Sequence, residues 1–242
     1  MRYSILFRYP DLNAFKTAID AAGIKPTDGD DWVRVWGAKI SVHGDFEGGF
    51  MTKPYAELYG MQGTFFGLQT LPQTAYNDYV VGLNRLGWRV ATHAVGDAAV
   101  DQVLQGHEKA NADKDLTANG WTIEHAFVTR PDQYPRMRKL NPINPYWVTY
   151  HFLTRDTISA GVYGPNQAVP SREEVLRMET VNNARLTDEQ AVEGSIEVGK
   201  LADFVVLGAD YMTIAPKAAE NLKALATYVG GNLVYRDPSF NP

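Results

Sequence analysis

Up to residue 141, short strand patterns alternate with longer helix patterns. The strand patterns are β-branched or aromatic runs, and the helix patterns carry apolar residues three and four positions apart. The predicted strands are 4–9, 32–42, 88–94 and 121–128, and the predicted helices are 11–23, 73–87, 97–110 and 130–141. Because helices connect successive strands, the order predicts right-handed crossovers and a parallel sheet, as in a doubly wound fold or a (β/α) barrel.

Cap residues define several of these boundaries. Asp11 is the predicted N-cap of the first helix, and Gly23 is its predicted stop. Gly87 ends the second helix, and Asp97 is the predicted N-cap of the third. The glycine-rich segment 44–70 predicts a long loop.

The alternating pattern stops after residue 141. Segment 142–170 begins with several prolines and predicts no clear strand. A single helix is predicted at 171–187, where Ser171 and Glu174 have capping-box spacing. Segments 194–210 and 224–237 then predict turn-separated strand pairs in a small β unit.

Composition excludes several classes of site and partner. The 242 residues contain no cysteine, so a metal site must use His, Asp, Glu or a modified side chain. A net charge of -5 without a Lys/Arg cluster predicts a protein that acts on small molecules and binds neither nucleic acid nor a membrane. No apolar run is long enough for a signal peptide or a membrane span, so a cytoplasmic location is expected.

Three polar residues lie near the ends of predicted strands, where parallel α/β folds form their ligand sites. Lys39 lies late in strand 32–42, His93 lies near the end of the next strand, and His125 lies on the strand after that. The two histidines are one strand–helix repeat apart, so we expect them side by side on adjacent strands. Two neutral imidazoles in such positions can share a divalent metal.

Each candidate also has a purely structural interpretation. A lone histidine in a strand often fills the core, and a lysine at a strand end often reaches solvent or pairs with an acid. Asp97 is either the helix N-cap or a carboxylate near His93 that supports that residue or handles protons. Glu124 directly precedes His125, so it is expected to face away from the site and to form a structural ion pair.

Four further polar residues complete the candidates. His43 lies in the glycine-rich loop and is a candidate for a pocket wall. His107 lies in a charged helical stretch and is expected to be solvated. Arg155 and Asp156 are adjacent and are expected to pair with each other.

Together these segments resemble the metal-dependent amidohydrolase superfamily, in its amidohydrolase 3 branch. The similarity is carried by VRVWGAKISVHGDFEGG, WRVATHAVGDAAVD, WTIEHAFVTRPDQYPRM, GSIEVGKLADFVVLGAD and YVGGNLVY. The resemblance implies a (β/α)8 TIM-type barrel, partial in this chain, followed by a small β-sandwich. The implied domains are residues 1–190 for the barrel and 191–242 for the sandwich segment.

The resemblance also implies roles for the candidate residues. His93 and His125 match the family's metal-binding histidines on strands five and six, and Lys39 matches a strand-four lysine that is carbamylated in two-metal members. A carbamate supplies anionic oxygens where a free ammonium would repel the cations. The implied cofactor is one or two divalent ions, with zinc expected, and the implied reaction is hydrolysis of an amide or other C–N bond of a small molecule by a metal-activated water.

The chain departs from the family in three places. It contains no His-x-His pair and no Gly-[Ser/Thr]-Asp run, and Asn141 directly precedes Pro142 where the family has two further strands. We therefore expect that the chain lacks the first barrel strands and an internal block, that Asn141 and Pro142 are far apart, and that this chain alone holds metal weakly. The alternative to an enzyme is a non-catalytic remnant that serves as a binding or scaffold protein. A homo-oligomer is compatible with either.

Overall fold

The computed structural model describes residues 2–44, 48–140, 154, 168–169 and 171–241. It divides into two compact units, residues 1–145 and 146–242. Segment 171–187, predicted as a single helix, therefore groups with the second unit, whereas the implied barrel domain of residues 1–190 includes it. The implied domain boundary stays a prediction. Asn141, Pro142, Arg155 and Asp156 lie outside the described residues.

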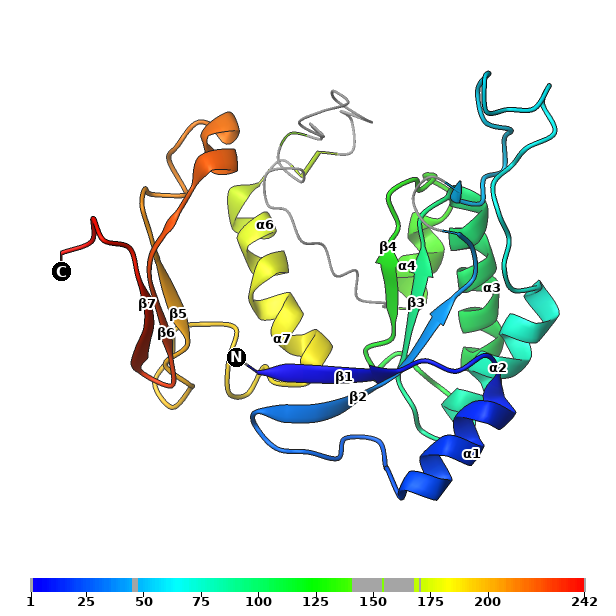
Figure 1. Cartoon of the computed structure of the whole chain (residues 1–242), viewed down its shortest axis with the longest axis horizontal. Coiled ribbons are helices and arrows are strands. Elements are labelled where there is room, and N and C mark those ends of the chain that lie inside the picture. The colour runs from blue at the N-terminus through cyan, green and yellow to red at the C-terminus, as the bar shows by residue number, and fades with distance from the viewer. Residues whose placement is uncertain (1, 45–47, 141–153, 155–167, 170, 242) are drawn as a thin grey trace. The chain divides into compact units, whose positions relative to one another are not determined.

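The first unit is a four-stranded parallel sheet, with helices α1, α2 and α3 beside it (Figure 1). Its elements are β1 (Tyr3–Phe7), α1 (Leu12–Ala22), β2 (Val33–Ser41), α2 (Gln73–Arg85), β3 (Val90–Ala94), α3 (Asp97–Asp113), β4 (Thr122–His125) and α4 (Tyr134–Leu140). The strands follow the order β1-β2-β3-β4, and every neighbouring pair is parallel. The predicted parallel α/β architecture is confirmed. Four strands are half of the eight that close a barrel, so the barrel stays a prediction.

The predicted caps of α1 are confirmed by their hydrogen bonds. The Asp11 side chain accepts a hydrogen bond from the Ala14 backbone N–H at 2.8 Å. Gly23 has a φ of 66°, the left-handed conformation that favours glycine after a helix. Asp97, in contrast, is the first residue of α3 rather than its cap, which is Gly96.

The core lies between the sheet and its helices. Phe15 of α1 contacts Tyr79 of α2 and Trp88 edge to face, with ring centroids 6.5 and 5.1 Å apart. The strands contribute alternate residues to this cluster, among them Ala38 and Ile40 of β2. The helices therefore bury one face of the sheet, and the intervening strand residues point to the other face.

The second unit contains two helices and a three-stranded antiparallel sheet. Its elements are α6 (Arg172–Glu179), α7 (Val181–Thr187), β5 (Phe204–Leu207), the 3-10 helix η3 (Pro216–Asn221), β6 (Ala224–Val229) and β7 (Asn232–Arg236). The hairpin between β6 and β7 turns through two glycines with φ of 57° and 77°, as a two-residue hairpin loop requires. The strand pair predicted at 224–237 is confirmed, whereas the β-sandwich stays a prediction.

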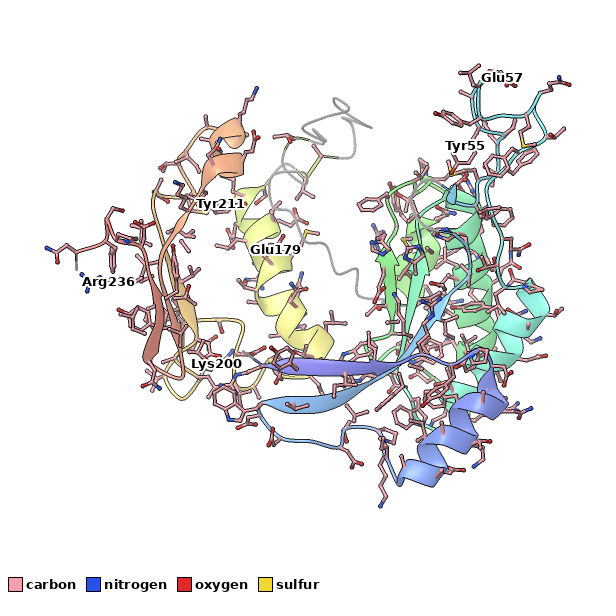
Figure 2. The ribbon with its side chains drawn as sticks, in the orientation of Figure 1. Tyr55, Glu57, Glu179, Lys200, Tyr211 and Arg236 are labelled. Carbon is pink, nitrogen blue, oxygen red and sulfur yellow. The ribbon has the colours of Figure 1, made fainter. Side chains whose placement is uncertain are left out.

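Two predictions in the second unit are wrong. The single helix expected at 171–187 is broken at Thr180, whose hydroxyl donates to the Leu176 carbonyl at 2.7 Å. Segment 194–210 forms only β5, because the residues before it are held in turns. The side chain of Lys200, labelled in Figure 2, lies in this segment. Its ammonium donates to the Gln190 carbonyl at 2.9 Å and the Ser195 hydroxyl at 2.7 Å.

Among the described residues, no helix combines the length and the apolar character that crossing a lipid bilayer needs. A membrane span is therefore not found in that part of the chain.

His107 of α3 is fully buried, so the expectation that it is solvated is wrong. Its ring lies edge to face with Trp121, with centroids 5.0 Å apart. Within the described part of the chain, neither ring nitrogen has a hydrogen-bond partner. Burial lowers the pKa of His107 to about 3, so the ring stays neutral in the folded chain.

We expect the free energy of unfolding to fall as the pH drops below about 6.5. There the unfolded chain protonates His107 while the folded chain keeps it neutral, which costs at most about 1.4 kcal/mol per pH unit. Urea unfolding over a pH series measures this slope. The His107→Leu variant should have a shallower slope, whereas Gln105→Leu, at an exposed position of α3, should match the parent. Equal slopes in the parent and His107→Leu would contradict the assignment.

Candidate active site

His93 and His125 lie together at the carboxyl ends of adjacent strands. In the parallel register of β3 and β4, Ala94 pairs with His125 and His93 pairs with Glu124. The two imidazole rings are edge to face, with centroids 4.5 Å apart. The structure thus brings together the two histidines that the sequence pattern selects.

The backbone at His125 makes this contact possible. His125 has a φ of 73° and Ala126 has a φ of 46°, a left-handed conformation that costs non-glycine residues about 1–3 kcal/mol each. The strand predicted at 121–128 therefore ends at His125. The Ala126 N–H donates to the Ala94 carbonyl at 2.8 Å, and the Val128 N–H donates to the Val95 carbonyl at 3.0 Å, which stabilises the turn. Because strand alternation ends here, the His125 ring can lie against His93.

A third histidine joins this pair. His43 is buried, and its ring centroid lies 4.6 Å from that of His93. The Nε2 atom of His43 accepts a hydrogen bond from the Val95 N–H at 2.6 Å, so a neutral His43 carries its proton on Nδ1. His43 therefore connects the loop after β2 to the end of β3. From the sequence it is only a candidate for a pocket wall, because a loop has no periodicity that fixes side-chain direction.

Lys39 of β2 forms an ion pair with Glu124 of β4, and both side chains are about four-fifths buried. The predicted ion pair of Glu124 is present, but the expectation that Glu124 faces away from the site is wrong. Glu124 pairs in register with His93 and so shares its face of the sheet. Burial and the charge of Arg8 lower the pKa of Lys39 to about 8, although Glu124 lies against the ammonium.

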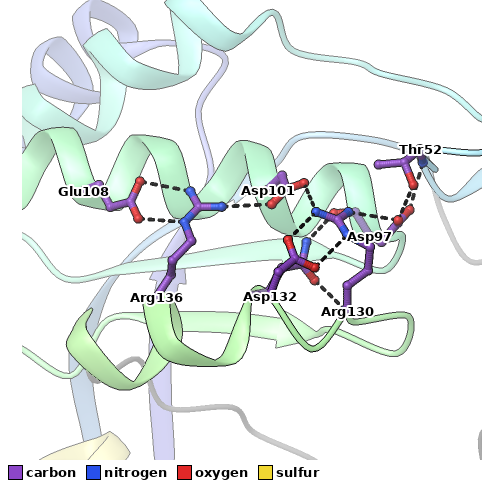
Figure 3. A network of polar contacts seen from close by, with 8 residues as sticks. Thr52, Asp97, Asp101, Glu108, Arg130, Asp132 and Arg136 are labelled. Atoms are coloured by element: carbon purple, nitrogen blue, oxygen red, sulfur yellow. Dashed lines mark hydrogen bonds and ion pairs between the residues drawn. The ribbon is translucent and has the colours of Figure 1, made fainter.

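Asp97 connects three loops at the same edge of the sheet (Figure 3). Its buried carboxylate accepts from the Thr52 N–H at 2.8 Å and from the Arg130 guanidinium at 2.9 Å. Burial opposes ionisation of this carboxyl, but the donors on Thr52 and Arg130 lower its pKa. Gly96 before it allows the close approach, because a Cβ there would lie 2.0 Å from the Phe50 carbonyl oxygen. Support of His93 by Asp97 stays a prediction.

The network extends from Arg130 along α3. Arg130 also pairs with Asp101 and Asp132, and Arg136 pairs with Asp101 at 2.9 Å and with Glu108 at 2.7 Å (Figure 3). These arginines hold α4 and the loop before it against α3. No sequence pattern marks these two arginines directly, although the acidic residues on α3 recur at helical spacing and so form one charged face.

The described residues supply only part of a metal centre. Among them, no group of three or more His, Cys, Asp or Glu side chains is placed to hold a metal ion. The donors at hand are the imidazoles of His93 and His125, which are nitrogen ligands of the kind that zinc takes, with Lys39 beside them if it is modified. His93, His125 and a modified Lys39 would therefore supply part of the ligands of a zinc ion.

Comparison with a family model decides the relationship. Residues 16–143 and 139–235 match the model of the amidohydrolase family. The chain belongs to this family, in its amidohydrolase 3 branch. The two matched segments meet at residues 139–143, where the strand–helix pattern stops.

Three known proteins are similar to this amidohydrolase chain. The N-substituted formamide deformylase of Arthrobacter pascens is 27% identical over 228 residues, covering 71% of this chain and 41% of that protein. The protein LONG AFTER FAR-RED 3 of Arabidopsis thaliana is 23% identical, covering 85% of this chain and 44% of that protein. An uncharacterized metal-dependent hydrolase from Pyrococcus horikoshii OT3 shares the fold, with a TM-score of 0.62 and 18% identity over 83% of this chain and 50% of that one.

The chain thus spans less than half the length of the two curated relatives that it matches. The alignment to the deformylase extends over 228 positions, more than the residues in 71% of this chain. The relative therefore has several tens of residues without a counterpart here. The junction at Asn141 and Pro142 lies outside the described residues, so a missing block at that point stays a prediction.

The Asp97 network gives a testable expectation for stability. Arg130→Gln should destabilise the chain by about 1–3 kcal/mol, because it leaves the buried Asp97 carboxylate with fewer donors. Arg85→Gln is the matched control, since Arg85 forms an exposed pair with Asp113 whose loss should cost much less. Urea unfolding measures both variants. An equal loss of unfolding free energy in the two variants would contradict the prediction that the Asp97 network stabilises the chain more than an exposed ion pair does.

Proposed function

We propose that this chain carries the metal-binding part of a hydrolase that cleaves amide-type C–N bonds of small molecules. The contact between the His93 and His125 rings, 4.5 Å apart at the ends of adjacent parallel strands, is the observation that carries the proposal. Strand ends are where α/β folds place their catalytic residues. Membership of the amidohydrolase family supports the reaction class.

In this proposal His93 and His125 hold one divalent ion, with zinc expected, and Lys39 serves as a ligand of one or two ions after carbamylation. When bound, the metal would activate water and polarise the substrate carbonyl. A lysine must be neutral to attack carbon dioxide, so that nitrogen bonds to carbon and a proton leaves. Burial lowers the pKa of Lys39 to about 8, so a larger fraction of the amine is neutral at neutral pH than in an exposed lysine. The remaining ligands come from elsewhere in the protein.

Neighbouring side chains keep these ligands in place. His43 bonds to the Val95 N–H and contacts the His93 ring, so it limits how that ring can move. The Nε2 atom of His93 lies 3.3 Å from the Gly44 carbonyl oxygen, which fixes the ring from the same loop. Metal sites depend on such support for their affinity. Glu124 pairs with the Lys39 ammonium before carbamylation, and this ion pair would be lost when Lys39 becomes an anionic carbamate.

The name of the Arthrobacter pascens relative suggests a formamide as the first substrate to test. A formamide is the smallest amide that a metal-activated water can cleave, yielding formate and an amine. The natural substrate, a cytoplasmic location and any homo-oligomer stay predictions.

A non-catalytic binding or scaffold protein is the second candidate. The two candidates differ in their need for metal: only the enzyme requires a bound metal ion to hydrolyse a substrate.

Replacing His93 or His125 by Ala should remove bound zinc and lower the rate of formamide hydrolysis by at least about a hundredfold, because each change removes a metal ligand. Elemental analysis and a formate assay measure the two quantities on the protein purified at its natural length. A parent protein without zinc and without activity would favour the scaffold alternative.

Gln105→Ala, at an exposed position of α3, is the control for these variants and should leave zinc and activity unchanged. His107 is unsuitable as a control because its buried ring packs in the core. Full zinc content and activity in a protein with both His93→Ala and His125→Ala would contradict the proposed ligands.

A further inference from the structure

Arg8 follows β1 on the face of the sheet that carries the candidate site. Phe7 before it and Tyr9 after it both pack against the core, and Phe7 pairs in register with the core residue Ala38. Because successive side chains of an extended chain alternate, Arg8 points to the face away from the helices. Lys39, which follows Ala38, points to that face too.

The same face continues through β3 and β4. Ser41 lies two positions after Lys39 on β2 and so shares its face of the sheet. Ser41 pairs in register with His93, and His93 pairs with Glu124, so these side chains lie on the same face as Lys39. In the parallel register of β1 and β2, Phe7 pairs with Ala38, so Arg8 after Phe7 lies beside Lys39 after Ala38. Glu124 is already paired with Lys39.

Arg8 is an exposed cation beside this site. No ion pair of its guanidinium is found within the described part of the chain. A planar guanidinium binds a carboxylate through two parallel hydrogen bonds, a geometry that suits recognition better than a single ammonium does. The positive charge thus matches an anionic group on a ligand.

Strand spacing limits how far that group lies from the reacting bond. β1 and β3 are two strands apart, which is about 10 Å across the sheet. An arginine side chain is long enough to cover much of this distance. Arg8 can therefore reach an anionic group of a substrate whose amide carbonyl lies at a metal held by His93 and His125.

We propose that Arg8 binds a carboxylate of the substrate, so that the site prefers N-acylated amino acids or similar acids to neutral amides. This specificity rests on the proposed hydrolase function. Hydrolysis of N-formylglycine would consume one water and release formate and glycine. N-formylglycinamide has the same formamide bond but no carboxylate, so it is the matched neutral probe.

Binding of both probes is measured by NMR titration of the protein purified at its natural length. The samples are the parent and its Arg8→Gln, Arg8→Lys and Arg2→Gln variants. The parent should bind N-formylglycine about tenfold to a hundredfold more tightly than N-formylglycinamide. Arg8→Gln should lose this preference while its affinity for the neutral probe stays the same. Arg8→Lys should retain part of the preference, because it keeps the charge but not the two-pronged geometry. Arg2, near the other end of β1, should have no effect.

Formate release in the same samples tests the hydrolase function separately. Hydrolysis of both probes, with no loss of acid preference in Arg8→Gln, would overturn the role of Arg8 and leave the hydrolase intact. Acid-selective binding that depends on Arg8, without hydrolysis of either probe, would support Arg8 and contradict the hydrolase. No acid preference in the parent would overturn the proposal in every case.

Discussion

The left-handed backbone at His125 and Ala126 is the constraint on which the candidate site depends. In a regular strand His125 would face the opposite side of the sheet from Glu124, and therefore from His93, which pairs with Glu124 in register. The positive φ at both residues ends the strand and lets the two imidazoles meet. A local backbone cost of this kind persists only where the surrounding structure compensates it.

The loops after β2, β3 and β4 provide that compensation. Val95 donates its N–H to His43 and accepts from Val128 through its carbonyl, so one residue joins all three loops. Asp97, at the start of α3, connects the same loops, because its carboxylate accepts from Thr52 in the loop after β2 and from Arg130 in the loop after β4. The ion pairs along α3 are therefore part of what keeps the strand ends in register, at a distance from the reacting groups.

The sequence predicts the strand ends well because strand–helix alternation and glycine or aspartate caps are local signals. It therefore places Lys39, His93 and His125 on successive strands correctly. It could not predict the turn at His125, since neither residue there is glycine. The burial of His107 had a signal, because it lies seven residues after the buried Val100, but its charged neighbours favoured solvent. The Lys39–Glu124 pair depends on register across two strands, which no local pattern fixes.

The central claim is that His93 and His125 act as one ligand pair, and a zinc titration followed through the 15N signals of the histidine rings tests it most directly. The account predicts that the rings of His93 and His125 respond together at the same zinc concentration, that the buried His107 does not respond, and that His93→Ala abolishes the response of His125. A response of His125 that persists unchanged in His93→Ala, or zinc saturation that leaves both rings unaffected, would contradict it.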